Sequence, residues 1–147
     1  MDLFSQDWSN KLTACFTTTI RESAKRAHGR PVSMFAVDFH PWHGAIYLAL
    51  LLEEEIDGDP ELHTPEEMAA WELYDCSNGI PAWNQALDFT KQLRALDPNE
   101  NDYLRAYRFI SSIISALETE IRSTYMIGRG FRISVAHPDT LEEFFKA

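Results

Sequence analysis

The sequence predicts an α+β protein in which a small, mainly antiparallel sheet packs against about four to five helices. Two apolar runs, residues 32–40 and 45–52, flank a short break that contains proline and glycine, which is typical of a β-hairpin. Four longer stretches repeat their apolar residues at steps of three and four, the spacing of one helix face. The predicted order α-β-β-α-α-α-β-α lacks the regular alternation of a doubly wound fold.

Length and composition favour a single domain over residues 1–147. Of its 147 residues, 45% are hydrophobic, enough for a core without disulfides or metals. The N-terminal residues lack the pattern of a signal peptide, and the longest purely apolar run has eight residues. A membrane-crossing helix needs about 20 such residues. We therefore expect a cytoplasmic protein, without membrane insertion, in which Cys15 and Cys76 are reduced thiols.

The first helix is predicted from an apolar stripe that begins at Trp8 and ends before Gly29 and Pro31. Asp7 or Ser9 would cap its start. Its last turns carry a basic cluster, which is either a solvated helix end or an anion site: Arg21, Lys25, Arg26, His28 and Arg30.

The hairpin is predicted to turn at Pro41-Trp42-His43-Gly44. Proline fixes φ where the turn starts, and glycine tolerates the positive φ that closes it. This turn length pairs residue 40 with residue 45 and sorts the side chains onto two faces. The first face is large and apolar, and we expect it to be core: Phe35, Val37, Phe39, Ile46, Leu48 and Leu50. The second is mixed, and we expect a helix to half cover it: Met34, Ala36, Asp38, His40, Ala45, Tyr47, Ala49 and Leu51.

The second half of the chain is predicted to be mainly helical. Residues 53–61 contain six carboxylates with glycine and proline, which indicates a loop. Thr64-Pro65 and Glu67 form a capping-box pattern that predicts a helix ending near residues 77–79. After it we expect a helix over 81–96 and then the longest helix, over 103–125, with Asn101 or Asp102 as cap. A third strand near 131–136 and a short helix over 139–145 follow.

Asp38, His40 and His43 are the most suggestive polar groups, because they share one end of the hairpin. Carboxylate and imidazole groups suit zinc, but no fourth ligand has suitable spacing. Otherwise His40 and His43 are exposed turn residues, and Asp38 bonds Tyr47 or the backbone. No nucleophile motif, dinucleotide fingerprint or phosphate loop is present. We expect no cofactor and no metal, with a small hydrolase or metal-dependent enzyme at this end of the hairpin as the alternative function.

The net charge of −10 favours a basic protein partner and opposes binding to nucleic acid or to anionic membranes. Trp42, at the tip of the hairpin, either packs against a neighbouring loop or is a contact residue. Together with Trp71, Trp83 and Tyr74, it could form an aromatic contact patch on an acidic surface. The candidate binding residues are Asp38, His40, Trp42, His43, Tyr47 and Trp71.

The passages VDFHPWHGAIYLALL and PEEMAAWELYD, with the acid-rich residues between them, resemble small bacterial α+β proteins of unknown function. Some of those families are similar to immunity proteins encoded beside polymorphic or contact-dependent toxins. The resemblance covers about residues 32–75. It implies a cytosolic, non-enzymatic binding protein whose acidic surface blocks a basic toxin, often a nuclease, and it assigns no catalytic residue.

Overall fold

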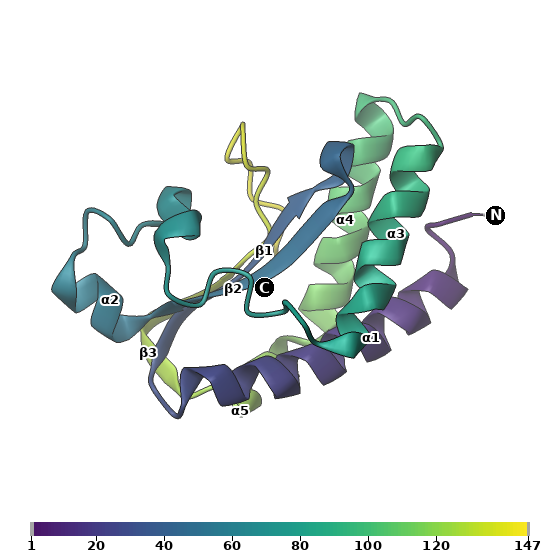
Figure 1. Ribbon diagram of the computed structural model, residues 1–147. Coiled ribbons are helices and arrows are strands. Elements are labelled where there is room, and N and C mark those ends of the chain that lie inside the picture. Colours follow the sequence, from purple (N-terminus) through teal and green to yellow (C-terminus); the bar gives the residue numbers. More distant parts are fainter. Residues whose placement is uncertain (1, 147) are drawn as a thin grey trace.

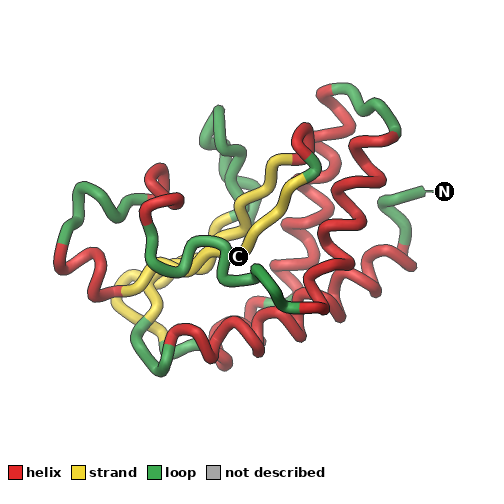
Figure 2. Tube along the Cα trace, viewed as in Figure 1, coloured by secondary structure: helices red, strands yellow, loops and turns green. Residues whose placement is uncertain are grey.

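The computed structural model, which describes residues 2–146, confirms the predicted α+β class. A three-stranded sheet has the order β2-β1-β3 (Figures 1 and 2). Among the described residues, none of the helices combines the length and the apolar character that crossing a membrane requires. The helices and strands are α1 (Gln6–Ala24), β1 (Val32–His40), β2 (Ala45–Leu52), α2 (Glu53–Gly58), α3 (Asn84–Ala95), α4 (Glu100–Ala116), α5 (Glu118–Thr124) and β3 (Ile127–Ser134).

The hairpin forms in the predicted register. Antiparallel pairing joins Phe39 with Ile46, and His40 with Ala45. The turn is a short 3₁₀ helix, Pro41–His43, and Gly44 closes it with φ of 64°. The positive φ explains why glycine stands there. The register holds because a slip of one residue would move the large apolar side chains out of the core.

Each face of the sheet has its own cover, and the two covers differ. The large apolar face packs against α1, α3, α4 and α5 in the main core. On the other face, a small cluster of Met34, Ala36, Ala49 and Leu51 is covered by Trp71, which is 3% exposed. In Figure 1 the segment that carries α2 lies on the opposite side of the hairpin from α3 and α4. The expected half-covering helix is therefore replaced by this segment, which we call the covering segment (residues 53–74).

The covering segment contradicts two predictions. Residues 53–58 form helix α2 rather than a loop, because the side chain of Glu55 accepts the N–H of Leu52 at 3.0 Å and acidic side chains suit a helix N-terminus. The predicted helix after Thr64 is a 3₁₀ stretch, Pro65–Ala70, and Thr64 makes no side-chain cap. The chain is then extended at Trp71, so that the indole turns onto the sheet and Leu73 bridges to Leu50.

Helix caps and ends also differ from the predictions. Ser5, rather than Asp7 or Ser9, caps α1. Asn99 caps α4 in a reciprocal pair with Asp102. The predicted longest helix is divided at Leu117, whose φ of −100° and ψ of 7° are not helical, so α1 is the longest helix at 19 residues.

The last two elements are corrected as well. β3 begins at Ile127, earlier than predicted, and pairs in parallel with β1. The pairing is parallel because α3, α4 and α5 bring the chain back to the end of the sheet where β1 begins. Residues 139–145 are not helical. They belong to a tight reversal, in which Phe144 donates its N–H to the carbonyl of Val135 and Ala136 bridges to Glu143. We call residues 135–144 the C-terminal loop.

Both cysteines are free and buried in the main core. Burial raises the pKa of the Cys15 thiol to about 11 and that of Cys76 to about 12. A thiol needs to be deprotonated to act as a nucleophile, so neither side chain is poised for that chemistry.

Candidate functional site

The turn of the hairpin meets one face of α4. Glu100, Tyr103, Leu104 and Tyr107 are spaced at i, i+3, i+4 and i+7, which places them on a single side of the helix. The hydroxyl of the buried Tyr107 donates to the carbonyl of Phe39 at 2.6 Å. This hydrogen bond holds the first turns of α4 beside the hairpin tip.

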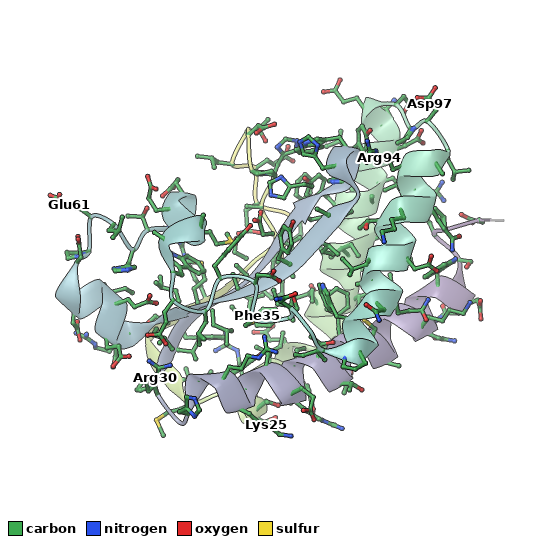
Figure 3. All side chains as sticks on the ribbon, viewed as in Figure 1. Lys25, Arg30, Phe35, Glu61, Arg94 and Asp97 are labelled. Carbon is green, nitrogen blue, oxygen red and sulfur yellow. The ribbon has the colours of Figure 1, made fainter. Side chains whose placement is uncertain are left out.

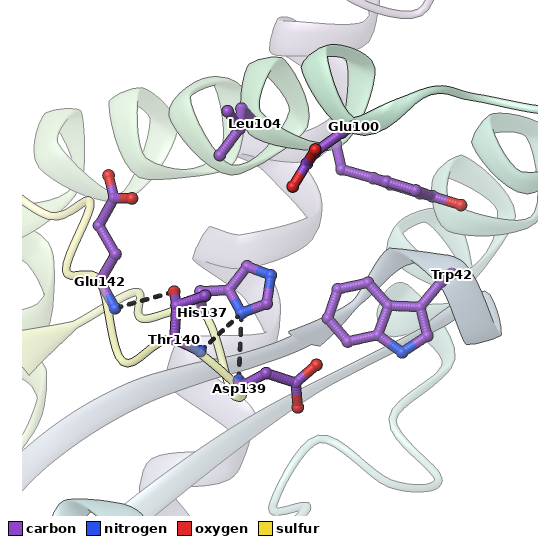
Figure 4. Close-up of a pocket in the computed structure, with 8 residues that line it drawn as sticks. Trp42, Glu100, Leu104, His137, Asp139, Thr140 and Glu142 are labelled. Atoms are coloured by element: carbon purple, nitrogen blue, oxygen red, sulfur yellow. Dashed lines mark hydrogen bonds between the residues drawn. The ribbon is translucent and has the colours of Figure 1, made fainter.

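The C-terminal loop lies beside the hairpin turn and α4 and completes the site. Nδ1 of His137 accepts the backbone N–H groups of Asp139 at 3.1 Å and Thr140 at 3.2 Å (Figure 4). The backbone N–H of Leu141 donates to the carbonyl of His137 at 2.8 Å. Because Nδ1 is occupied as an acceptor, the neutral ring carries its proton on Nε2. The loop is thus folded around the imidazole, which lies against Tyr107 with ring centroids 5.2 Å apart.

Trp42 packs against this loop. Its ring centroid lies 5.2 Å from that of His137 at an interplanar angle of 31°, and 6.0 Å from Tyr103 in an edge-on arrangement. The side chain is half-buried. Of the two alternatives for Trp42, the structure shows packing against a neighbouring loop, but part of the indole still faces a hollow.

This hollow, which we call the tip hollow, has a volume of about 560 Å³. Its apolar walls are Trp42, Tyr103 and Leu104, and its polar lining consists of Glu100, His137, Asp139, Thr140 and Glu142. In Figure 4 the carboxylates of Glu100 and Asp139 enter the space from opposite sides. All three acidic residues are exposed, and none forms an ion pair within residues 2–146. The hollow therefore joins an aromatic wall to carboxylates that form no ion pair within residues 2–146.

A second polar group lies on the other side of the C-terminal loop. Oδ1 of Asp38 lies 2.8 Å from Nε2 of His40, and Oδ2 accepts the hydroxyl of Tyr74 at 2.8 Å. The hydrogen bond with Asp38 raises the pKa of His40, although partial burial opposes this effect. Burial and the same carboxylate raise the pKa of Tyr74. These side chains line a hollow of about 440 Å³, which also touches His137 and Asp139.

The predicted site residues are only partly brought together. Asp38 and His40 are paired, but Asp38 bonds Tyr74 rather than Tyr47, whose half-buried ring lies 5.7 Å from that of Tyr74. His43 is exposed, and its ring is 6.4 Å from that of His40. Trp71 and Trp83 are buried, so they do not contribute to a contact surface. Across the described part of the chain, no three His, Cys, Asp or Glu side chains are grouped as a metal site requires.

The basic cluster at the end of α1 is engaged by the protein itself. Arg26 donates to the carbonyls of Cys76 at 2.8 Å and Asn78 at 2.7 Å. Arg30 pairs with Glu54 at 2.8 Å and with Glu72 at 2.6 Å. These partners favour the interpretation of a structural helix end over an anion site.

Sequence reasoning missed the residues of the tip hollow other than Trp42. Glu100 precedes the predicted helix, which α4 extends to Glu100, and the sequence pattern treats Tyr103 only as part of the apolar face. Asp139 begins the short helix predicted over 139–145, whereas Pro138 before it and the imidazole of His137 make a turn. A search for carboxylates next to the apolar face of α4 would have found Glu100, but not the hollow that it shares with Asp139. No family model, curated protein or solved structure matches this chain.

Proposed function

We propose that this chain is a cytoplasmic, non-enzymatic protein-binding module of the immunity-like kind, and that its tip hollow docks onto a basic protein partner. The observation that carries the proposal is the tip hollow itself. A half-buried tryptophan forms its wall, and the three exposed carboxylates around it form no ion pair within residues 2–146.

The charges explain why a basic partner suits this surface. Glu100, Asp139 and Glu142 line one hollow and form no ion pair within residues 2–146, so a cation placed among them would gain favourable charge interactions. The net charge of −10 adds a long-range field of the same sign. Such a field speeds association with a basic protein and makes the rate depend on salt.

The aromatic wall supplies the short-range part of the interaction. Tryptophan and tyrosine are enriched among residues that contribute most to binding energy at protein interfaces. Trp42 is held by His137 and Tyr103, so little side-chain entropy is lost when a partner covers it. A rigid aromatic surface surrounded by charge is the composition expected of a specific contact.

The test compares two variants that each remove two negative charges. Glu100→Gln/Asp139→Asn alters the tip hollow, whereas Glu61→Gln/Glu67→Gln alters exposed positions in the covering segment. Figure 3 shows Glu61 at the opposite end of the molecule from Arg94, which lies near the hairpin tip. Each chain is co-expressed with the products of its neighbouring genes and purified at low salt.

We expect a basic protein to co-purify with the wild type and with the control variant, and its affinity to fall at least about ten-fold for the hollow variant. Binding should weaken as salt rises. Equal retention by all three chains would contradict the assignment to the tip hollow. Recovery of no basic protein from any of them would contradict the function.

A second candidate function, a small hydrolase, is favoured by the Asp38–His40 pair. A carboxylate 2.8 Å from an imidazole orients the ring and supports its action as a general base. The adjoining hollow of about 440 Å³ could admit a small substrate. Turnover of model esters or phosphodiesters by the wild type, lost in His40→Ala and unaffected by Trp42→Ala, would favour this function over binding. The absence of turnover in the wild type would remove it.

A further inference from the structure

We infer that the tip hollow accepts a single arginine side chain of the partner, in preference to lysine. This inference rests on the proposed function, because it specifies the cation that a basic partner would insert. It follows from three features of the hollow, namely its aromatic wall, the placement of its carboxylates and a hydrogen-bond donor in its lining.

The aromatic wall favours a planar cation. A guanidinium can stack on the face of an aromatic ring, and tryptophan is the best such surface. Trp42 lines the hollow, and Figure 4 shows its indole broad side on, with the carboxylate of Asp139 beside the ring edge. A guanidinium lying on this indole would therefore also meet a carboxylate at its edge. An ammonium is compact and strongly hydrated, and it gains less from such a wall.

The carboxylates favour a cation with several directed donors. Glu100 enters the hollow from α4 and Asp139 from the C-terminal loop, on opposite sides of the space beside Trp42. Guanidinium has five N–H donors arranged in a plane, so it can satisfy two carboxylates at once. Lysine has three donors on one nitrogen and cannot span the two sides in the same way. Leu104 offers apolar contact for the aliphatic stem of the side chain.

The imidazole of His137 suits the backbone of the inserted residue. Nδ1 accepts two backbone N–H groups of the loop, so Nε2 carries the donor hydrogen. In Figure 4 the second ring nitrogen faces the space between Glu100 and Trp42. A cation alone would not use this donor, but a peptide carbonyl next to the arginine side chain would accept from it. The hollow thus matches an arginine residue within a protein rather than a free inorganic cation.

The test uses three small probes: N-acetyl-arginine amide, N-acetyl-lysine amide and N-acetyl-citrulline amide. Citrulline keeps the shape of arginine without its charge. Each is titrated into the ¹⁵N-labelled full chain and followed by NMR. We expect the arginine probe to shift the Trp42 indole N–H and the backbone signals of residues 137–142. Its affinity should be at least about five-fold higher than that of the lysine probe, and citrulline should give no saturable shift.

Variants locate the binding. Asp139→Asn and Glu100→Gln should each lower the arginine affinity at least about three-fold, while Glu61→Gln should leave it unchanged. Thermal unfolding of each variant confirms that it is folded. Equal affinities for arginine and lysine would overturn the selectivity and leave the proposed function standing. Shifts that avoid the tip hollow, or no saturable shift with either cation, would overturn the inference, whereas the proposed function is decided separately by co-purification.

Discussion

The covering segment and the tip hollow are both acidic and each contains a tryptophan, but they use these groups in opposite ways. In the covering segment, Trp71 is buried on the sheet, and its indole N–H donates to the carbonyl of Thr64 at 3.1 Å. In the tip hollow, Trp42 is half-buried and borders open space. The first tryptophan covers the sheet, and the second leaves part of its indole facing an open hollow.

The carboxylates differ in the same sense. In the covering segment, Glu53 and Asp57 both pair with Arg129, and Glu54 pairs with Arg30. Hydrogen bonds from the backbone and side chain of Arg129 lower the pKa of Glu53. The three carboxylates of the tip hollow form no ion pair within residues 2–146. A dense run of acidic residues in a sequence therefore does not locate the available negative charge, because distant arginines can neutralise it.

The largest effect that separates the two regions is expected from Trp71→Ala. Removing this buried indole should lower the free energy of unfolding by about 3–5 kcal/mol, since it leaves a cavity over Ala36 and Ala49. Urea denaturation measures the loss. If the alanine variant does not fold, Trp71→Phe should fold with a smaller loss. A loss within about 0.5 kcal/mol for Trp71→Ala, the range of surface changes, would contradict the structural role of Trp71.

Glu55→Ala should have the next largest effect. Glu55 accepts the N–H of Leu52 at 3.0 Å and that of Glu72 at 2.7 Å, and its side chain is 10% exposed. Leaving these donors unsatisfied should cost about 1–3 kcal/mol of unfolding free energy. Glu142→Ala in the tip hollow is the matched comparison and should stay within about 0.5 kcal/mol of the wild type. Equal losses in the two variants would remove the distinction between structural and available carboxylates.

Trp42→Ala should destabilise the protein less than Trp71→Ala, by about 1–2 kcal/mol, because the half-buried indole still packs on His137 and Tyr103. The same change should weaken binding of the proposed basic partner by more than about 1 kcal/mol. Chemical denaturation and a binding titration give the two numbers. A stability loss of about 3–5 kcal/mol without any change in binding would assign Trp42 to the core and would make the two tryptophans equivalent.

The smallest effect is expected from the pH dependence of stability, which the Asp38–His40 pair between the two regions should produce. The pKa of His40 is raised in the folded protein, so its contribution to stability is complete below the ordinary histidine value of about 6.5. That contribution should be lost as pH rises through the raised pKa. Because His40 is 26% exposed, solvent screens the interaction.

Urea unfolding at about pH 6 and pH 8.5 should show this decline in the wild type and a smaller one in Asp38→Asn, which lacks the charged partner. The carboxylates with lowered pKa, Glu53 and Glu72, titrate on the acidic side of this window and do not confuse the comparison. The same pH dependence in both proteins would show that the Asp38–His40 pair does not link protonation to stability.

Sequence alone determined those features that depend on short-range periodicity. The register of the hairpin follows from the alternation of large apolar residues and from a turn whose length is set by Pro41 and Gly44. The stripes of α1 and α3 follow from the helical period, which places apolar residues on one side. Both patterns concern neighbours within a few residues, so the local chain geometry is enough to predict them.

Only the tertiary structure decided the covering segment, the direction of β3 and the tip hollow. Each depends on groups that are distant in the sequence. Arg129 and Arg30 neutralise α2, and residues 42, 100 and 139 meet around one space. An isolated passage does not indicate whether a carboxylate will meet an arginine or whether a tryptophan will be covered. Charge pairing and burial act through space, and the packing of α4 and the C-terminal loop on the hairpin brings these groups together.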